Sequence, residues 1–219
     1  EYFGLTQITV AAAADLVKLT DVVTAPAPAT LAWPAADAQR ESLEAMLFAP
    51  QGSFTVSNTF STNQYGEVGL AAGTTPLRQP TDVARPGTPA AAIAADNAAR
   101  GVVLDDGAST NFLSAANTGL TPPWVSLTAP VVVGASVSFS APVIVDYRNN
   151  TWKLNATSPL SASAPAGYPA SFSNPRTAAP ENVGGDLSIA SFNVLNYFTT
   201  LGTSNPSCVA YLDRAGNGV

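Results

Sequence analysis

Short alternating or apolar runs fill the first 156 residues and predict a chain built mainly of β-strands. Residues 54–57 alternate apolar and polar side chains, as a half-buried strand does. Residues 142–147 and 151–155 form two similar runs, and the turn-forming Arg148-Asn149-Asn150 between them predicts a β-hairpin. The other segments predicted as strands are 2–10, 14–19, 45–48, 65–71, 102–104 and 131–138.

One helix and several loops interrupt this pattern. Residues 90–100 have the strongest helix propensity in the chain, and Gly101 follows at a position where helices often end. A short turn is expected within 38–44, and the prolines of 21–36 and 80–89 indicate loops. The predicted fold class is therefore mainly β with one or two short helices. An OB-like β-barrel fits best and a β-sandwich is the alternative, because the number of strands does not separate them.

A change of composition predicts a domain boundary after the β-rich region. Residues 157–185 are rich in Ser, Pro, Ala and Gly, as a linker is, and an apolar run over 187–194 then predicts a strand. We therefore expect a β-rich domain over 1–156, a linker over 157–185 and the start of a second domain over 186–219. The sequence begins without Met inside a strand-like segment, so the absence of a signal peptide carries no information.

The composition limits the classes of chemistry that the chain can perform. Charged residues make up only 11% of the chain, which is typical of secreted or cell-surface bacterial proteins, and the net charge of −6 argues against a broad nucleic-acid-binding surface. Histidine is absent, so the commonest general base and imidazole metal ligands are excluded. The single cysteine, Cys208, is either a free thiol or the partner of a cysteine elsewhere. No apolar run approaches the ~20 residues that a membrane-spanning helix needs.

Basic and aromatic side chains cluster at one place, the tip of the predicted hairpin. Tyr147, Arg148, Trp152 and Lys153 lie there, and together they form a candidate nucleic-acid-binding surface in which the rings stack on bases. The alternative is that the aromatic side chains pack into the core. Asp105-Asp106-Gly107 is interpreted as a turn that ends a strand, because the ligand series of a calcium loop is missing.

Two parts of the sequence resemble a known family. Residues 188–198 (Ser-Ile-Ala-Ser-Phe-Asn-Val-Leu-Asn-Tyr-Phe) resemble the opening strand of the catalytic domain in ExeM/NucH-type bacterial extracellular nucleases, which belong to the endonuclease/exonuclease/phosphatase superfamily. The segments upstream resemble the OB-like accessory domain that precedes this strand in the same family. These segments are Glu1–Ile8, Tyr65–Val68, Gln79–Thr81, Asn97 with Arg100 and Leu104–Gly107. Asn174–Arg176 resembles the junction between the accessory and catalytic domains of that family.

The resemblance implies an OB-like accessory domain, a linker and an isolated first strand of an α/β-sandwich nuclease domain. It implies that Asn193 helps to hold an active-site Mg²⁺ and the scissile phosphate, a role suited to a neutral amide oxygen. The family's other catalytic residues, including a Glu and a His with its Asp partner, have no counterpart in this chain. We therefore expect the accessory part of a secreted, Mg²⁺-dependent nuclease that is inactive by itself. DNA is favoured over RNA as the substrate of the parent protein, and the sequence leaves both open.

Two other functions remain open from the sequence. The low charge and the Ala/Thr/Ser-rich composition favour a structural or protein-binding module of the bacterial cell envelope. An OB-like carbohydrate-binding domain is a further alternative, because barrels of this kind bind oligosaccharides as well as oligonucleotides.

Overall fold

The computed structural model describes residues 4–6, 8–18, 20–21, 23–187, 189–191, 193, 205–209, 211–212 and 216–217. The chain divides into two compact units, Glu1–Pro175 and Arg176–Val219. Every helix and strand of the described residues lies in the first unit.

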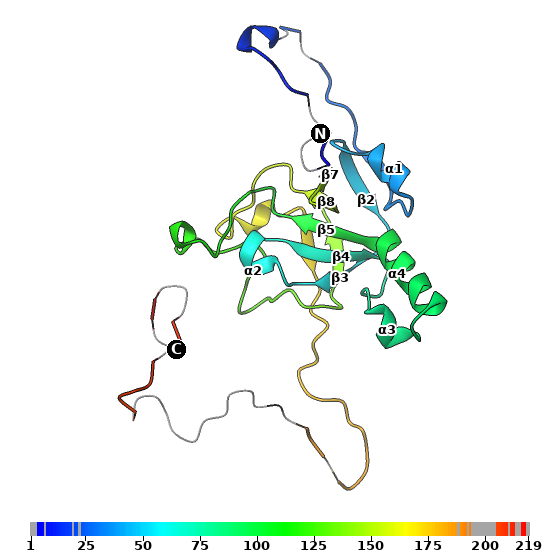
Figure 1. Cartoon of the computed structure of the whole chain (residues 1–219), viewed down its shortest axis with the longest axis vertical. Coiled ribbons are helices and arrows are strands. Elements are labelled where there is room, and N and C mark those ends of the chain that lie inside the picture. Colours follow the sequence, from blue (N-terminus) through cyan, green and yellow to red (C-terminus); the bar gives the residue numbers. More distant parts are fainter. Residues whose placement is uncertain are drawn as a thin grey trace. The chain divides into compact units, whose positions relative to one another are not determined.

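A single mixed sheet forms the centre of the first unit (Figure 1). Its order over the described residues is β1-β2-β7-β8-β5-β4-β3-β6-β9. The β1–β2 and β5–β8 pairs are parallel, and the other neighbouring pairs are antiparallel. The strands are β1 (Ala29–Ala32), β2 (Leu47–Gln51), β3 (Phe54–Asn58), β4 (Val68–Ala72), β5 (Gly101–Asp105), β6 (Ser136–Phe139), β7 (Val143–Arg148), β8 (Thr151–Asn155) and β9 (Ala170–Phe172).

The sheet is curled because one continuous segment, residues 47–58, pairs with two strands that are not neighbours, β7 and β4. Only Gly52 and Ser53 separate β2 from β3 in the sequence, and Gly52 has a φ of 84°. β2 pairs with β7, whereas β3 pairs with β4. Residues 47–58 therefore flank both ends of the strand row β7-β8-β5-β4, and this row has to bend to meet them.

The core lies on one face of the curled sheet and follows the alternation of its strands. On β7 and β8 the core residues are Val143, Val145, Trp152 and Leu154, all of which are buried. Burial of each such large side chain contributes about 1.5–3 kcal/mol. The largest side chains with almost no exposure include Phe48, Phe54, Val56, Val68, Leu70 and Leu104, from four further strands.

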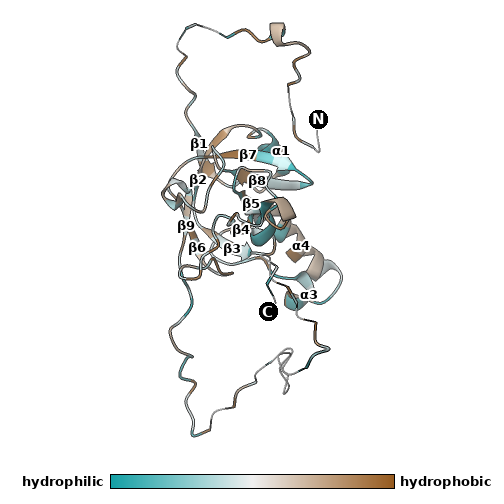
Figure 2. Cartoon of the chain, turned by 90° about the vertical axis from the view of Figure 1, so that its left-hand side faces the viewer, coloured by the Kyte–Doolittle hydropathy of each residue, from teal (hydrophilic) through white to brown (hydrophobic). Residues whose placement is uncertain are grey.

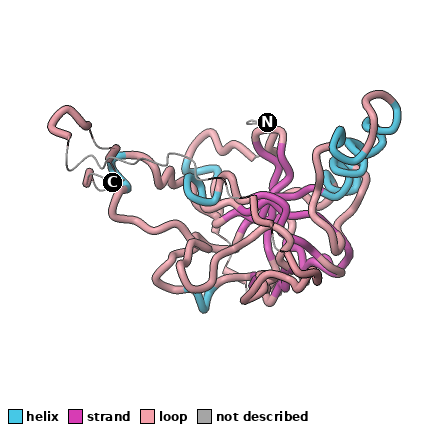
Figure 3. Tube along the Cα trace, turned by 90° about the horizontal axis from the view of Figure 1, so that it is seen from below, coloured by secondary structure: helices cyan, strands magenta, loops and turns pink. Residues whose placement is uncertain are grey.

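Helices lie around the strands rather than between them (Figure 3). The α-helices are α1 (Asp37–Glu41), α2 (Thr62–Tyr65), α3 (Pro80–Val83) and α4 (Thr88–Arg100), and the 3₁₀-helices are η1 (Ala13–Asp15), η2 (Ala115–Asn117) and η3 (Pro165–Gly167). α1 is hydrophilic along its length (Figure 2). α3 and α4 form an excursion between β4 and β5 and contact each other.

A buried arginine connects α1 to the end of α4. The Arg40 guanidinium donates hydrogen bonds to Ala98 O (3.2 Å) and Ala99 O (2.7 Å) in the last turn of α4. It also donates to Pro34 O at 2.7 Å and stacks over the Trp33 ring at 5.2 Å. A cation at a helix C-terminus binds carbonyls that have no partner within the helix, so Arg40 fixes the orientation of α4 against the sheet.

The structure confirms the mainly β class, the hairpin and the long helix. β7 and β8 are antiparallel neighbours, and α4 contains the whole of the predicted helix 90–100. Gly101 follows the helix as expected, but its φ of −70° is not left-handed. The glycine is suited to this position by space, because a Cβ atom would lie 3.0 Å from Asn97 O.

Four elements lie where loops or a linker were predicted. β1 lies within 21–36, α3 within 80–89, and both η3 and β9 lie within the predicted linker 157–185. β9 pairs with β6, and the first compact unit extends to Pro175 rather than ending at 156. Ala, Ser and Pro give weak strand signals, and the pairing with a neighbouring strand overrides them.

Three predicted strands are not formed in the described residues. Residues 13–15 form η1 in place of a strand over 14–19, and the described part of 2–10 contains no strand. Residues 1–3, 7 and 19 lie outside the described residues. Of the strand predicted over 187–194, the described residues 187, 189–191 and 193 are not in a strand, and the others lie outside the description. A lone strand makes no ladder hydrogen bonds, which accounts for this difference.

No helix in the described part of the chain is long and apolar enough to cross a membrane.

Candidate functional site

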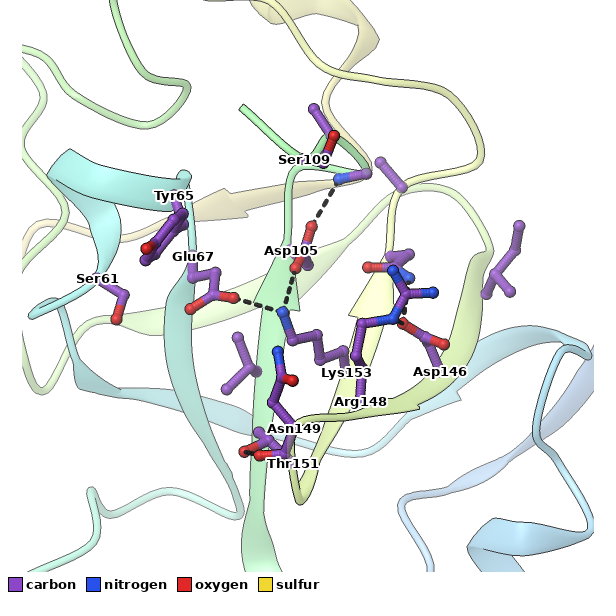
Figure 4. Close-up of a pocket in the computed structure, with 16 residues that line it drawn as sticks. Ser61, Tyr65, Glu67, Asp105, Ser109, Asp146, Arg148, Asn149, Thr151 and Lys153 are labelled. Atoms are coloured by element: carbon purple, nitrogen blue, oxygen red, sulfur yellow. Dashed lines mark hydrogen bonds and ion pairs between the residues drawn. The ribbon is translucent and has the colours of Figure 1, made fainter. Parts of the chain in front are cut away.

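A polar cleft lies on the face of the sheet opposite the core (Figure 4). Its volume is about 870 Å³. Strand alternation places it there, because Asp146 and Arg148 on β7 point away from the core that Val145 enters. On β8, Lys153 and Asn155 do the same.

An ion-pair triad forms the floor of the cleft. The Lys153 ammonium lies between two carboxylates, donating to Glu67 Oε1 and, at 2.9 Å, to Asp105 Oδ2. The Lys153 side chain is only 13% exposed. The parallel pairing of β5 with β8 brings Asp105 beside it, and Glu67 directly precedes β4 on the other side of β5.

The triad keeps Lys153 charged. Burial by itself lowers the pKa of Lys153, but hydrogen bonds and charges from Asp105 and Glu67 outweigh burial, so this pKa lies above its ordinary value of 10.5. Lys153 is thus a neutralised structural cation rather than a group free to bind an anion.

A second cluster lies beside the triad. Asn155 Nδ2 donates to Asp146 Oδ2 at 3.1 Å, and Arg148 Nε lies 4.0 Å from the same oxygen. Arg148 Nε is shielded from solvent and makes no hydrogen bond. Together the cleft contains three carboxylates (Glu67, Asp105 and Asp146) and two cations, so it carries one surplus negative charge.

Two short connections form the rim of the cleft. α2 contributes Ser61 just before it and Tyr65 at its end, and the Tyr65 side chain is 41% exposed. The β7–β8 turn contributes Asn149, whose φ of 56° is followed by a φ of 59° at Asn150. Two successive positive φ values define the type I′ turn that suits a two-residue hairpin, and Asn tolerates this conformation better than most residues.

The Asp105-Asp106-Gly107 segment is a turn that ends β5, as predicted. Asp105 Oδ1 accepts a hydrogen bond from the Gly107 N–H at 2.9 Å, and Asp106 Oδ1 accepts one from the Ala108 N–H at 2.8 Å. Gly107 has a φ of 73°, so the turn favours glycine there. Within the described residues, no group of three or more His, Cys, Asp or Glu side chains is placed to hold a metal ion.

Asp106 is a fully buried carboxyl group below this turn. The Asp106 Oδ2 atom has no hydrogen-bond partner. It lies close to Gly66, and a Cβ atom added to Gly66 would be 2.5 Å from Asp106 Oδ2. Burial raises the pKa of Asp106 to about 6, although the hydrogen bond from Ala108 opposes the rise. Trp124 covers this region and donates from Nε1 to Gly66 O at 2.8 Å.

The structure separates the four hairpin residues predicted to form one binding surface. Tyr147 and Trp152 are a cross-strand pair on the core face, with ring centroids 4.7 Å apart, and Trp152 Nε1 donates to Asp37 at 2.6 Å. Arg148 and Lys153 lie on the opposite face, in the cleft. Neighbouring residues of a strand point to opposite faces, so rings and cations adjacent in sequence do not meet. Binding of nucleic acid by these residues stays a prediction.

Asn193 belongs to the second unit and is exposed. It offers one amide oxygen, whereas Mg²⁺ requires near-octahedral coordination, and the described residues contain no acidic cluster to complete the set. Asn193 therefore does not form a magnesium site by itself, and its role as a ligand stays a prediction.

Sequence reasoning did not single out Glu67 or Asp146, and it interpreted Asp105 only as a turn residue. A signal existed for Asp146, because it occupies the polar phase of the alternating run 143–148. For Glu67 no local signal existed, since its partner Lys153 lies 86 residues away.

Comparisons of the chain with protein-family models, with curated proteins and with solved structures find no match.

Proposed function

We propose that the first unit is the OB-like accessory domain of a secreted, Mg²⁺-dependent phosphodiesterase, and that residue 186 opens its catalytic domain. The observation that carries this proposal is the Ser191-Phe192-Asn193 motif, which follows a β-rich unit in the order found in the nuclease family that the sequence resembles. The parent protein then acts on nucleic acid, DNA rather than RNA, outside the cell or at its surface.

The strand pairing supports the OB-like assignment. Residues 47–58, β4 and β5 are antiparallel neighbours in sequence order. The β7–β8 hairpin follows, with β8 parallel to β5 and β7 antiparallel to β2. Treating 47–58 as one bent strand gives five strands that return to the first, which is the arrangement of a partly open Greek-key barrel of the OB type.

The distribution of charge favours a positioning role for this domain over a role in binding DNA. A nucleic-acid surface needs cations that can meet phosphates, but Lys153 is neutralised by two carboxylates and Arg148 lies beside Asp146. The chain also carries a net charge of −6. The domain would then orient the catalytic domain, while catalytic residues further along the protein contact DNA.

The same charge distribution favours the second candidate function, a structural or protein-binding module of the cell envelope. A module that binds proteins or supports the cell envelope needs no cations that bind phosphate, so the neutralised Lys153 and Arg148 are compatible with this role. The two candidates differ in what the rest of the protein does, so a measurement of activity separates them.

The test compares the 219-residue chain with the longer protein that the proposal implies. With Mg²⁺ and plasmid DNA, we expect no cleavage by the 219-residue chain and cleavage by the longer protein. Asn193→Ala in the longer protein should lower the cleavage rate by about 100-fold or more, as loss of a group that positions the metal and phosphate does. Asn182→Ala, at an exposed position outside the motif, is the matched control and should leave the rate unchanged.

Mg²⁺-dependent cleavage by the 219-residue chain would refute its inactivity. A longer protein without nuclease activity would favour the envelope module instead. An Asn193→Ala variant as active as the control would remove the motif as the basis of the proposal.

A further inference from the structure

We propose that the cleft on the outer face of β5, β7 and β8 binds a neutral polyhydroxylated ligand, a sugar unit of an oligosaccharide. This assigns the first unit a ligand of its own, beyond the proposed nuclease, and it holds whether or not that nuclease activity exists. The volume of about 870 Å³ lies within the range of small-molecule sites.

The charges of the cleft disfavour a phosphate group as its ligand. Both cations already face carboxylates: Lys153 is held by Glu67 and Asp105, and Arg148 lies 4.0 Å from Asp146. A phosphate would add its charge to a cleft that already carries one surplus negative charge.

The hydrogen-bonding groups that remain open are of both kinds. The Arg148 side chain is 41% exposed and lines the cleft, so its guanidinium offers N–H donors even though Nε itself is shielded from solvent. Glu67 and Asp146 use Oε1 and Oδ2 in the contacts described above, which leaves the second oxygen of each carboxylate as an acceptor. A phosphate oxygen offers acceptors only, and an ammonium group offers donors only, so neither satisfies both kinds. A hydroxyl group donates and accepts, and a sugar presents several hydroxyl groups in a fixed arrangement.

The rim supplies the apolar contact that a sugar ring also needs. Tyr65 lies at the mouth of the cleft next to Glu67, with 41% of its surface exposed (Figure 4). An aromatic ring with an apolar face and a polar tip suits the C–H face of a pyranose, whose hydroxyl groups then point toward the polar floor. The type I′ turn holds Asn149 in a defined position, where it also lines the cleft.

The experiment measures binding of cellohexaose, maltohexaose and chitohexaose to the 219-residue chain by titration calorimetry and by NMR. We expect saturable binding of at least one of them, with an affinity that does not change with salt, because no ion pair with the ligand forms. Tyr65→Ala should weaken this binding about tenfold, a change of about 1.4 kcal/mol. Phe60→Ala is the matched control, since Phe60 is 90% exposed in the same connection but does not line the cleft.

A second variant tests the polar floor. Arg148→Met removes the guanidinium donors that line the cleft and should also weaken binding of the sugar, while its thermal unfolding temperature confirms that the fold is kept. An oligothymidylate serves as the competing ligand. Failure of all three sugars to bind, or equal affinity in Tyr65→Ala and Phe60→Ala, would overturn the proposal. Salt-dependent binding of the oligothymidylate that is lost in Arg148→Met would do so too, and it would identify a nucleic-acid site.

Discussion

The buried carboxyl group of Asp106 makes the stability of the fold depend on pH in a predictable direction. Its pKa rises from an ordinary value of 3.8 to about 6, chiefly because of burial. The nearby Asp105 and Glu67 carboxylates also raise this pKa, whereas the Ala108 N–H and Lys153 lower it. The folded protein binds this proton more tightly than the unfolded chain does, so protonation of Asp106 stabilises the fold. This stabilisation is complete below pH 3.8. It is lost as the pH rises through about 6.

The Asp106→Asn variant removes this dependence. A pKa difference of about two units corresponds to about 3 kcal/mol between the two ends of the window. Asn keeps the oxygen that accepts from Ala108, but it places an NH₂ group where Oδ2 has no partner, at a cost of about 1–3 kcal/mol at every pH. We therefore expect the variant to be less stable than the wild type below pH 3.8 and of similar or higher stability above about 6.

Urea unfolding followed by tryptophan fluorescence measures this difference across the pH window. For each pH, the free energy of unfolding of the variant is subtracted from that of the wild type. The readout is how this difference changes with pH, because the cost of the NH₂ group is the same at every pH and does not affect the change. Asp21→Asn, at an exposed position, controls for the loss of one carboxyl group. A constant difference between Asp106→Asn and the wild type from pH 3.8 to about 6 would refute the assignment of this pH dependence to Asp106.

Three further variants test the contacts that hold the fold. Lys153→Met leaves two mostly buried carboxylates without a cation and should lower the free energy of unfolding by about 3 kcal/mol, with a smaller loss for Lys153→Arg, both measured by urea titration. Arg40→Met removes the donors at the end of α4 and should cost about 2–4 kcal/mol and speed amide hydrogen exchange in that helix. Gly66→Ala combines a φ of 69° with a contact of 2.5 Å to Asp106 and should cost about 2 kcal/mol or more, measured by thermal unfolding. Gly52→Ala, at a φ of 84° with open space around the Cβ position, should cost less, and equal losses would contradict a role for the contact.

Local patterns were sufficient for the elements whose stability is local. The β7–β8 hairpin joins a run rich in β-branched residues to an alternating run through an Asn-Asn turn, and α4 is a run of Ala-rich sequence that ends at a glycine. In both cases the residues that contact each other are close in sequence, so propensity and periodicity indicate the same structure.

Elements that depend on distant partners could not be predicted in this way. β1 and β9 are short, and their Ala, Ser, Thr and Leu residues give no clear pattern. Each exists because a longer strand offers it a ladder of hydrogen bonds. The converse holds for 14–19, which has strand-like composition but forms no strand over its described residues. Strand propensity reports packing against neighbours, and a single sequence does not identify those neighbours.

The candidate site follows the same rule in part. The basic and aromatic residues of the hairpin were identified, but the prediction grouped them on one surface. Strand alternation by itself places Tyr147 and Arg148 on opposite faces, so the sequence contained the signal for this separation. The triad of Lys153 with Glu67 and Asp105 needs the parallel β5–β8 pair, which no local pattern indicates. The chemistry of the cleft therefore became visible only with the sheet assembled.

The pairing of strands that are far apart in sequence has a consequence for biosynthesis. β2 finds its partner when Leu47 meets Ile144, and β5 finds its second partner only when Lys153 is available to Val103. While a ribosome is still adding the intervening residues, β2 and β5 present unpaired edges that invite aggregation. We therefore expect folding to wait until β8 has been synthesised, and to be slow for a domain of this size. For the exported protein that we propose, such a delay lets export precede folding.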